Sequence, residues 1–503
     1  MRDVVVTLDA GTGSGRCVAF DLAGRPLASA QEPFHYRLFS APDLPLLRGF
    51  DLDAAAFWGA LARCAREVTG QLPADAHVIG VIATSQREGC VFVDADSQVL
   101  YAGPNLDARA AIEGIELQQT VTMDRLHALT GHTPPYIFPL ARYLWFRKHH
   151  DAKRIASLFM LNDWITFLLS GERVAEHSNA GESMLYDVSR REWCDEILDA
   201  LAVPRAILPP LRDAGAPAGR VTARAAAATG LPEGTPVFAG GADTQSALLG
   251  SGVWEAGATG AVLGTTAPVQ MVTAQPIVDP AGRLWTSAHV VADRWVLESN
   301  GGDTGDAYRW LLELLFGGTD AAAHAAAEAV IAATPDTDRQ IYCHFGPVIF
   351  SLAEMNPFRP AGMLFRFPLL HVDRPARGEV LRAYVESIAY AIRGNCEQIA
   401  AVSGRPIGAL TLSGGMTRSP TLVQLIADTL GAPVAVGSVT ESASLGCAIL
   451  AAVAAGAYPT LADAVAAMTS AASVEPDPAS AARCDERYRR WRGVYDMLLG
   501  WTL

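Results

Sequence analysis

Lysine is almost absent from this chain. Of its 39 basic residues only Lys148 and Lys153 are lysines, and all the others are arginines. A P-loop of the G-x-x-x-x-G-K-[ST] type needs a lysine directly after its second glycine, and protein kinases need a lysine on a strand near the nucleotide. Neither lysine of this chain stands in such a position. The sequence therefore excludes both of these ATP-binding designs.

Paired cysteines and long apolar runs are also missing. The eight cysteines form no C-x-x-C pair, so neither zinc-ribbon nor disulfide spacing is present, and a reducing cytoplasm is the simplest location. The most apolar stretch, Leu445–Ala455, is too short to cross a bilayer, and no signal peptide precedes the first strand at Val4. We therefore expect a cytoplasmic protein with no membrane partner.

An excess of positive charge is missing as well. The formal net charge is −14, and only 18% of the residues are charged whereas 50% are hydrophobic. A nucleic-acid surface needs a basic footprint, so we expect no nucleic-acid partner. With 503 residues the chain is too long for one compact core, and we expect at least two domains.

Strands and helices alternate along the chain, and the pattern starts again near residue 250. Apolar strands are expected at Val4–Leu8 and Val78–Ala83 in the first half, and at Gly260–Leu263 and Ala409–Leu412 in the second. We predict an α/β protein of two domains, residues 1–248 and 249–503, with loops that face each other across a cleft. The tail from Pro459 is expected to form a short helical closure. The clearest helical patterns are Phe57–Val68, Leu140–Phe146, Asn162–Ser170, Ala321–Ala333, Val380–Ile399 and Ser442–Ala455.

Four small-residue loops follow the predicted strands. They are Asp9–Arg16, Gly240–Asp243, Gly264–Thr266 and Ser413–Ser419. An acidic residue that closes a strand can face Mg²⁺, and glycines let backbone N–H groups approach a phosphate closely. Ordinary turn chemistry also explains any one of these loops alone. Together they indicate a nucleotide and metal site.

The four loops resemble those of the FGGY carbohydrate kinase family, whose members have the two-domain actin-like (ribonuclease H-like) ATPase fold with an interdomain cleft. The resemblance extends from Val4 to about Ala457. It implies an ATP-dependent sugar kinase with ATP and Mg²⁺ as cofactors, in which Asp9 and Asp243 hold the metal. The residues that it implies for nucleotide binding are Asp9, Thr12, Gly13 and Arg16 in a first phosphate loop, Gly264 and Thr265 in a second, and Gly305, Gly414, Gly415 and Ser419 around the adenosine.

Asp243 matches the catalytic aspartate of that family. A sugar hydroxyl is a poor nucleophile, and a carboxylate within hydrogen-bond reach accepts its proton while the γ-phosphoryl group transfers in line. The alternative is that Asp243 only caps a helix that begins at Thr244. Both roles are compatible, and substitution separates them.

Substrate binding is implied for two polar segments and one further side chain. Gln86-Arg87-Glu88 resembles the polyol-binding segment of the family, in which arginine donates and glutamate accepts hydrogen bonds. Its alternative is a solvated loop with a local ion pair. Asp107 and Arg109 resemble another element near the substrate, with a surface ion pair as the alternative. Gln245 is a further expected contact to a hydroxyl.

The chain departs from the family pattern in two places. Arg142 stands where the first family signature has a lysine ahead of an aromatic-x-Trp, which keeps the charge. Proline replaces the expected glycine in Phe365-Arg366-Phe367-Pro368-Leu369-Leu370-His371, and this weakens inferences about that segment.

The substrate is predicted only by class. Arg87-Glu88-Gly89, Asn105–Ala110, Ser178–Gly181 and Gly346–Ser351 look most like the autoinducer-2 kinase branch, although the last segment is also compatible with a buried strand. Xylulokinases share the scaffold and much of the loop spacing. We expect a small linear polyol or ketose, pentulose-like or the autoinducer-2 precursor, as the small-molecule partner, and leave a homodimer open.

Two other classes of protein share part of this pattern. A chaperone-like or otherwise non-catalytic ATPase of the actin superfamily would have the phosphate loops but no need of Gln86-Arg87-Glu88, and no added peptide-binding region is evident after Ala457. A sugar-binding regulator without activity would need neither Asp9 nor Asp243. Both readings are therefore less favoured than a kinase.

Overall fold

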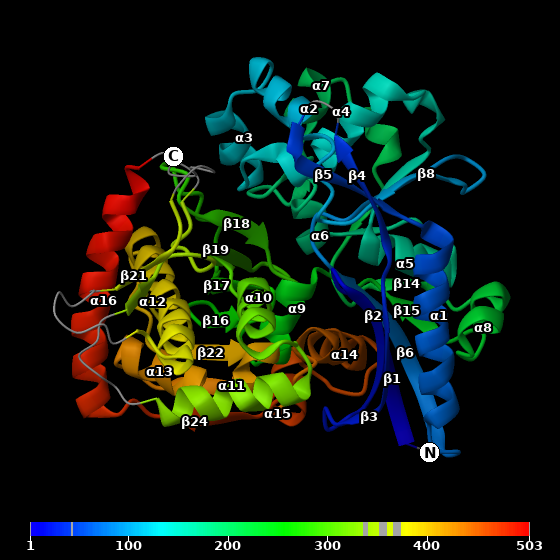
Figure 1. The fold of residues 1–503 in the computed structure, drawn as a ribbon. Helices are drawn as coiled ribbons and strands as arrows, with labels where there is room; N and C mark the ends of the chain where they lie inside the picture. Colours follow the sequence, from blue (N-terminus) through cyan, green and yellow to red (C-terminus); the bar gives the residue numbers. More distant parts are fainter. Residues whose placement is uncertain (1, 42–43, 335–340, 352–359, 366–373, 502–503) are drawn as a thin grey trace.

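The computed structural model describes residues 2–41, 44–334, 341–351, 360–365 and 374–501, and it consists of two α/β halves (Figure 1). Each half is built on its own twisted sheet. The first sheet has six strands in the order β14-β15-β6-β1-β2-β3, and the second has seven in the order β18-β19-β17-β16-β22-β23-β24.

The two sheets repeat one pattern of pairing. In the first half β1 pairs antiparallel with β2 and parallel with β6, while β2 continues to β3 and β6 to β15. In the second half β16 pairs in the same way with β17 and β22, while β17 continues to β19 and β22 to β23. The expected restart of the pattern near residue 250 is thus a repeated topology. The strand bounds are β1 Arg2–Ala10, β2 Ser14–Asp21, β3 Pro26–Pro33, β6 Ala76–Ser85, β14 Pro217–Arg220, β15 Pro236–Phe238, β16 Thr259–Val262, β17 Thr266–Thr273, β18 Trp285–Ala288, β19 Trp295–Asp303, β22 Leu410–Ser413, β23 Val434–Gly437 and β24 Ala471–Val474.

Amphipathic helices cover the sheets. Helix α1 (Ala54–Gln71) begins where Asp53 accepts hydrogen bonds from the Ala55 and Ala56 amides, and it buries Phe57 and Leu61 against the first sheet. The second sheet is covered by α12 (Arg377–Ser403), whose predicted apolar stripe is buried. The other covering helices are α5 Leu161–Ser170, α8 Ala223–Thr229, α10 Gly305–Phe316, α11 Ala321–Ala333, α13 Pro420–Leu430, α15 Leu461–Met468 and α16 Pro478–Leu499.

Two helices pack against each other between the sheets: α9 (Asp243–Gly250) and α14 (Ser442–Ala454) (Figure 1). They meet at glycines, because a Cβ on Gly250 would lie 2.0 Å from the Ser442 carbonyl oxygen and one on Gly446 1.9 Å from that of Ser246. Helix α14 also packs on the first sheet, where Leu445 and its neighbours join the β1 and β6 side chains. The predicted domain boundary after residue 248 lies inside α9, and it stays a prediction.

An additional lobe extends the first half and reaches the second. The Trp285 indole on β18 donates to the Thr133 carbonyl oxygen at 2.8 Å, and the Thr286 amide donates to that of Gly131 at 3.0 Å. These bonds join the lobe to β18 of the second half. The lobe and its connections contain β4 Tyr36–Ala41, β5 Leu44–Leu52, β7 Cys90–Val93, β8 Val99–Gly103, α2 Ala111–Glu116, α3 Met123–Thr130, α4 Pro139–His149, β9 Ser157–Met160, β10 Ala175–Glu176, α6 His177–Gly181, β11 Tyr186–Asp187, β12 Glu192–Trp193, α7 Asp195–Ala200 and β13 Leu211–Arg212.

Two expectations about local structure were wrong. The tail after Pro459 is more than a short helical closure, because β24 adds a strand to the second sheet and α16 packs on α13. Gly346–Ser351 is not a buried strand, apart from an isolated bridge between Pro347 and Gly302. The short strands β20 (Ile341–Cys343) and β21 (Met363–Phe365) pair nearby, and residues 366–371 of the departing family segment lie outside the described residues. Among the described residues, no helix is long and apolar enough to cross a membrane.

Candidate active site

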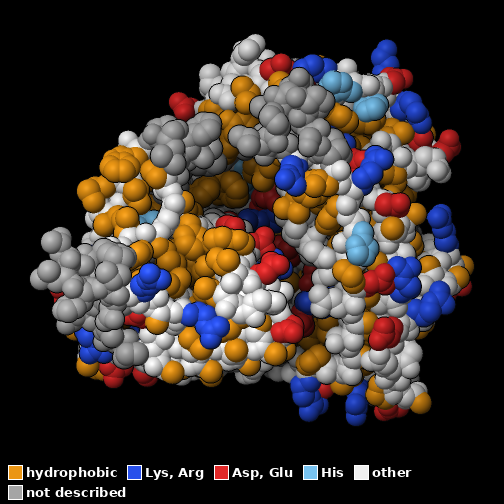
Figure 2. Space-filling view, viewed as in Figure 1, with side chains coloured by type: hydrophobic (Ala, Val, Ile, Leu, Met, Phe, Trp, Pro, Cys, Tyr) orange, Lys and Arg blue, Asp and Glu red, His pale blue; other side chains and the backbone are white. Residues whose placement is uncertain are grey.

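Asp9 and Asp243 come from different elements of the first half and lie close enough to influence each other electrostatically. Asp9 is the penultimate residue of β1, and Asp243 is the first residue of α9. Burial, and next the Asp243 carboxylate, raise the pKa of Asp9 to about 7 against the opposing effect of Arg16. Burial also raises the pKa of Asp243, against the opposing effect of Arg87. Figure 2 shows a hollow between the halves, with acidic side chains on its walls.

The capping alternative for Asp243 was wrong. Ala242 is the residue at the N-cap of α9 and forms no side-chain cap, so Asp243 already lies in the first helical turn. Its carboxylate accepts a hydrogen bond from the Thr244 hydroxyl at 3.0 Å. The helix therefore does not need this carboxylate as its cap, and the side chain is available for chemistry.

The predicted first phosphate loop is held from both halves. The Tyr36 hydroxyl donates to the Thr12 carbonyl oxygen at 2.6 Å, and the Asn105 amide donates to the Thr12 hydroxyl at 3.0 Å. Arg16 forms an ion pair with Glu441, which directly precedes α14. A Cβ on Gly13 would meet no atom within 4 Å, so this backbone faces open space. The loop is thus fixed while its tip stays open to a ligand.

The segment Gln86-Arg87-Glu88 is buried, so the solvated-loop alternative was wrong. None of its three residues is more than 8% exposed. Gln86 holds the first phosphate loop, since its amide nitrogen donates to the Gly11 carbonyl oxygen at 3.2 Å. Glu88 has a left-handed backbone (φ 57°), and burial raises the pKa of its carboxyl against the opposing charge of Arg87. Positive φ at a buried glutamate marks a constrained position.

A buried polar cluster surrounds Arg87 and includes residues that the sequence analysis missed. Arg87 donates to both carboxylate oxygens of Glu298, at 2.6 and 3.0 Å. Gln245 donates to Glu182 at 3.3 Å, and its own carbonyl oxygen Oε1 is buried without a partner. His132 lies 3.3 Å from Glu182. Single acidic or histidine residues far apart in the chain carry no signal that would have revealed this cluster.

Electrostatic pairing controls the ionisation of this cluster. Burial alone would raise the pKa of Glu182, but His132 and Arg87 hold it below its usual value. Burial alone would lower the pKa of His132, but Glu182 keeps it above its usual value. The pairing therefore favours the charged form of both groups.

Asp107 and Arg109 form a buried ion pair, so the surface alternative was wrong for them too. The guanidinium lies 2.6 Å from Asp107 and 2.6 Å from Asp51, and it stacks 5.1 Å from the ring centroids of Tyr101 and Trp145. Arg109 lines a cavity of about 600 Å³ whose lining does not include Asp243. The predicted contact of these two residues with the sugar stays a prediction.

Arg142, which stands at the position of the family signature, connects this ion pair to the segment Gln86-Arg87-Glu88. Its guanidinium is fully buried and donates to the Glu88 carbonyl oxygen at 2.6 Å and to that of Asp107 at 3.2 Å. An arginine can therefore replace the lysine of the family signature, because this position requires hydrogen-bond donors to backbone carbonyl oxygens.

The predicted nucleotide residues of the second half line one cavity of about 590 Å³, except Gly414, which directly precedes the lining residue Gly415. A Cβ on Gly305 would lie 2.2 Å from the Gly264 carbonyl oxygen, and Gly414 has φ +92° with the Leu263 oxygen 2.5 Å from its would-be Cβ. Only glycine fits both positions. Ser419 caps α13 and donates to Glu328 at 2.6 Å. The cavity is lined by Gly264, Thr265, Gly305, Tyr308, Arg309, Ala321, His324, Ala325, Glu328, Val385, Gly415, Met416, Arg418, Ser419 and Leu422.

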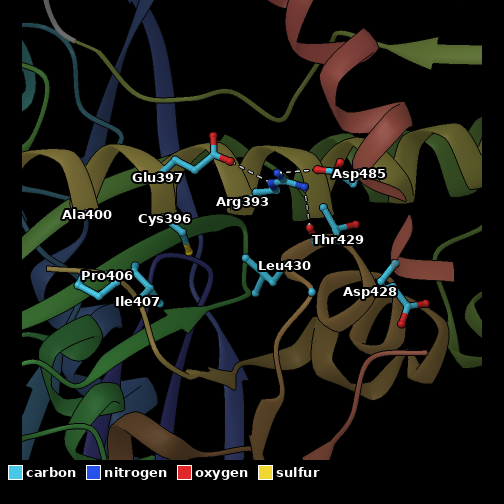
Figure 3. A pocket seen from close by; sticks show the side chains of 12 residues that line it. Arg393, Cys396, Glu397, Ala400, Pro406, Ile407, Asp428, Thr429, Leu430 and Asp485 are labelled. Carbon is cyan, nitrogen blue, oxygen red and sulfur yellow. Dashed lines mark hydrogen bonds and ion pairs between the residues drawn. The ribbon is translucent and has the colours of Figure 1, made fainter. Parts of the chain in front are cut away.

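Another cavity, of about 440 Å³, lies between α12, α13 and α16 and contains no predicted site residue (Figure 3). Arg393 crosses it and binds Glu397 and Asp485, each at 2.9 Å, and the Thr429 carbonyl oxygen at 3.1 Å. Its guanidinium is thus paired within the protein.

Magnesium fits the donor set without a preformed cage. The described residues contain no group of three or more His, Cys, Asp or Glu side chains that could hold a metal ion. Mg²⁺ binds oxygen ligands and commonly takes one or two carboxylates together with phosphate oxygens and water. The Asp9 and Asp243 carboxylates repel each other while both are ionised, and together they match that requirement.

Known proteins are similar to this chain in sequence and in fold. Models of the N-terminal and C-terminal domains of the FGGY family of carbohydrate kinases match residues 4–250 and 260–455. An autoinducer-2 kinase of Salmonella typhimurium is 31% identical over 517 residues, covering 98% of this chain and 94% of that protein. The crystal structure of xylulose kinase from Rhodospirillum rubrum has a TM-score of 0.84 at 27% identity and covers 98% of this chain and 99% of that one. Plasmodium falciparum glycerol kinase with ADP reaches 0.84 at 17% identity, over 98% of both chains, which is a likeness of fold alone.

Proposed function

The chain belongs to the FGGY family of carbohydrate kinases, and we propose that it transfers the γ-phosphate of ATP to a hydroxyl of a small linear polyol or ketose, with Asp243 as general base. The electrostatic proximity of Asp9 and Asp243 carries this proposal. One carboxylate lies at the end of β1, beside the predicted phosphate loop, and the other lies at the start of α9.

Each half has its own part in the proposed reaction. The cavity around Gly305 and Ser419 takes the nucleotide base and ribose. Arg16 and the loops at Thr12 and Thr265 donate hydrogen bonds to the phosphates. Asp9 would hold Mg²⁺, which when bound would supply positive charge that offsets the charge of the transferring group.

Asp243 performs the proton transfer. Its carboxylate accepts the proton of the attacking hydroxyl, which is worth on the order of 10²–10⁴-fold in rate. Arg87 and Glu88 orient the sugar by donating to and accepting from its hydroxyls. Closure of the halves excludes water from the γ-phosphate, which prevents hydrolysis of ATP.

The substrate is a pentulose-like ketose or polyol or the autoinducer-2 precursor. The 31% identity to an autoinducer-2 kinase over nearly the whole chain supports the second option, and the likeness to a xylulose kinase supports the first. A screen of ADP release with pentuloses, polyols and the autoinducer-2 precursor distinguishes these options. An acceptor that raises ADP release well above the rate without sugar identifies the substrate.

Replacement of Asp243 by asparagine tests the assignment of the base. Asp243→Asn is expected to lower kcat by at least about 100-fold because the amide cannot accept the hydroxyl proton. ADP binding, measured by calorimetry, should stay within about twofold, since the nucleotide cavity is lined by other residues. Asp195→Asn, at an exposed carboxylate at the start of α7, is the matched control. Wild-type turnover by Asp243→Asn would refute the role of Asp243.

A further inference from the structure

The buried cluster around Arg87 contains charged side chains to which the proposed phosphoryl transfer assigns no role. Arg87 donates to both oxygens of Glu298, and its guanidinium lies 3.7 Å from Glu182. Glu182 in turn lies 3.3 Å from the imidazole of His132. All four side chains are buried. The cluster thus combines two cations and two carboxylates.

Neutral hydrogen-bond donors fix the two carboxylates in place. The Gln270 amide donates to Glu298 at 2.6 Å, and the Ser287 hydroxyl donates to Glu182 at 2.9 Å. Glu298, Gln270 and Ser287 belong to the second half, whereas Glu182 belongs to the first. The arrangement therefore depends on how the two halves meet.

The charges of this cluster balance within the protein. In the part of the chain that the structure describes, Arg87 and His132 are the cations in ion-pair contact with Glu182 and Glu298. Each of them is already paired with a carboxylate. Glu88 and Asp243 add further acidic groups within electrostatic range of Arg87. A second anion would therefore find no unpaired cation in the cluster.

The cluster lies next to the proposed acceptor site. Gln245, two residues after Asp243, donates directly to Glu182. Arg87, which resembles the sugar-binding arginine of the family, forms the ion pair with Glu298. A group on the sugar that contacts Arg87 therefore experiences the charges of Glu182 and Glu298.

We propose that Glu182 and Glu298 are specificity-determining residues, which cancel the charges of Arg87 and His132 so that the site accepts an uncharged polyol or ketose and rejects a sugar acid of the same length. This inference rests on the proposed function and adds the charge of the acceptor to it. A substrate carboxylate would have to break an existing buried ion pair or stay buried without a cation of its own, and both cost free energy. Hydroxyl groups require neither.

The test compares one uncharged acceptor with one sugar acid. The probes are the best five-carbon ketose or polyol from the ADP-release screen and xylonate, with kcat/KM measured for each. Wild type is expected to prefer the uncharged acceptor by about 100-fold or more. Glu298→Gln frees the charge of Arg87, and it should lower this preference at least about tenfold, chiefly through a lower KM for xylonate. Glu182→Gln removes the carboxylate that lies beside both His132 and Arg87. It should also lower the preference for the uncharged acceptor.

Controls separate specificity from damage to the fold. Glu196→Gln removes an exposed carboxylate that pairs with Arg125 on the lobe surface, and it should leave the preference unchanged. ADP binding by calorimetry shows which variants are folded. The wild-type preference is itself a test that needs no variant: equal use of xylonate would overturn the inference.

The outcomes distinguish this inference from the function beneath it. If wild type phosphorylates neither class of acceptor, the proposed function fails. If it phosphorylates the uncharged acceptor but both variants bind ADP and keep the wild-type preference, the inference is overturned and the proposed function stands.

Discussion

Asp9 is a half-buried carboxyl whose charge is disfavoured in the free protein. Burial and the neighbouring Asp243 raise the pKa of Asp9 to about 7, so it binds a proton below that pH. A divalent cation binds only the ionised form. Because the folded-state pKa lies above the unfolded value, ionisation of Asp9 removes stability as the pH rises toward 7. This residue therefore favours ligand binding at the expense of the stability of the empty protein.

The activity of the enzyme should therefore depend on pH and magnesium together. At limiting Mg²⁺, kcat/KM for ATP is expected to fall about tenfold per pH unit below about 7, and excess Mg²⁺ should move the midpoint to lower pH because metal competes with the proton. Asp9→Asn should abolish activity and raise the thermal midpoint at about pH 8, since the amide keeps the neutral form. A profile that is flat from about pH 5.5 to 8.5 would show that Asp9 has an ordinary pKa.

Helices α9 and α14 are the elements that position the proposed base Asp243 relative to the predicted phosphate-binding residues. Asp243 is the first residue of α9, and Glu441, the partner of Arg16, directly precedes α14. The helices approach so closely at Gly250 and Gly446 that neither position has room for a Cβ. Their packing therefore determines where Asp243 lies relative to the phosphate loop.

Widening this helix contact should reduce catalysis. Gly446→Ala forces α9 and α14 apart, because the new Cβ would lie 1.9 Å from the Ser246 carbonyl oxygen. A displacement of about 1 Å at the reacting groups is expected to lower kcat by on the order of 10²-fold, while ADP binding in its separate cavity is kept. Gly493→Ala on α16 is the matched control, since its Cβ would meet no atom within 4 Å. Unchanged kcat in a folded Gly446→Ala protein would show that this contact does not position Asp243.

At the scale of the whole molecule, polar contacts join the two halves across the hollow. Arg16 pairs with Glu441, Arg87 pairs with Glu298, and Trp285 donates to Thr133. The first of these holds a side chain that the proposed mechanism directs to the phosphates. Glu441 and the nucleotide would then compete for Arg16. A homodimer, which the sequence left open, stays open.

Removal of this competition should strengthen nucleotide binding. Glu441→Gln is expected to lower the Kd for ATP a few-fold at low ionic strength, because Arg16 no longer has to leave a carboxylate. The difference should shrink in high salt, since the ion pair is partly exposed and screened. Glu255→Gln, at an exposed position, removes the same charge as a control. A weaker or unchanged affinity would mean that Arg16 does not bind phosphate.

Much of this organisation could be predicted from the sequence. The repeated strands, the α12 stripe and the loop at Asp9 depend on hydrophobic periodicity and on glycine, which act over a few residues. The two-domain FGGY fold and the carbohydrate kinase class were confirmed by the family models over most of the chain. Local order, and the resemblance built on it, were therefore determined by the sequence itself.

Only the tertiary structure decided which charged groups meet. Arg87 was recognised, but its partner Glu298 lies 211 positions away, on a strand of the other half. Asp107 and Arg109 were expected near the sugar, and the structure groups Arg109 with a different cavity. A buried charge is stable only beside its partner, and that pairing depends on how two sheets and the helices between them pack. No local pattern in the chain encodes it.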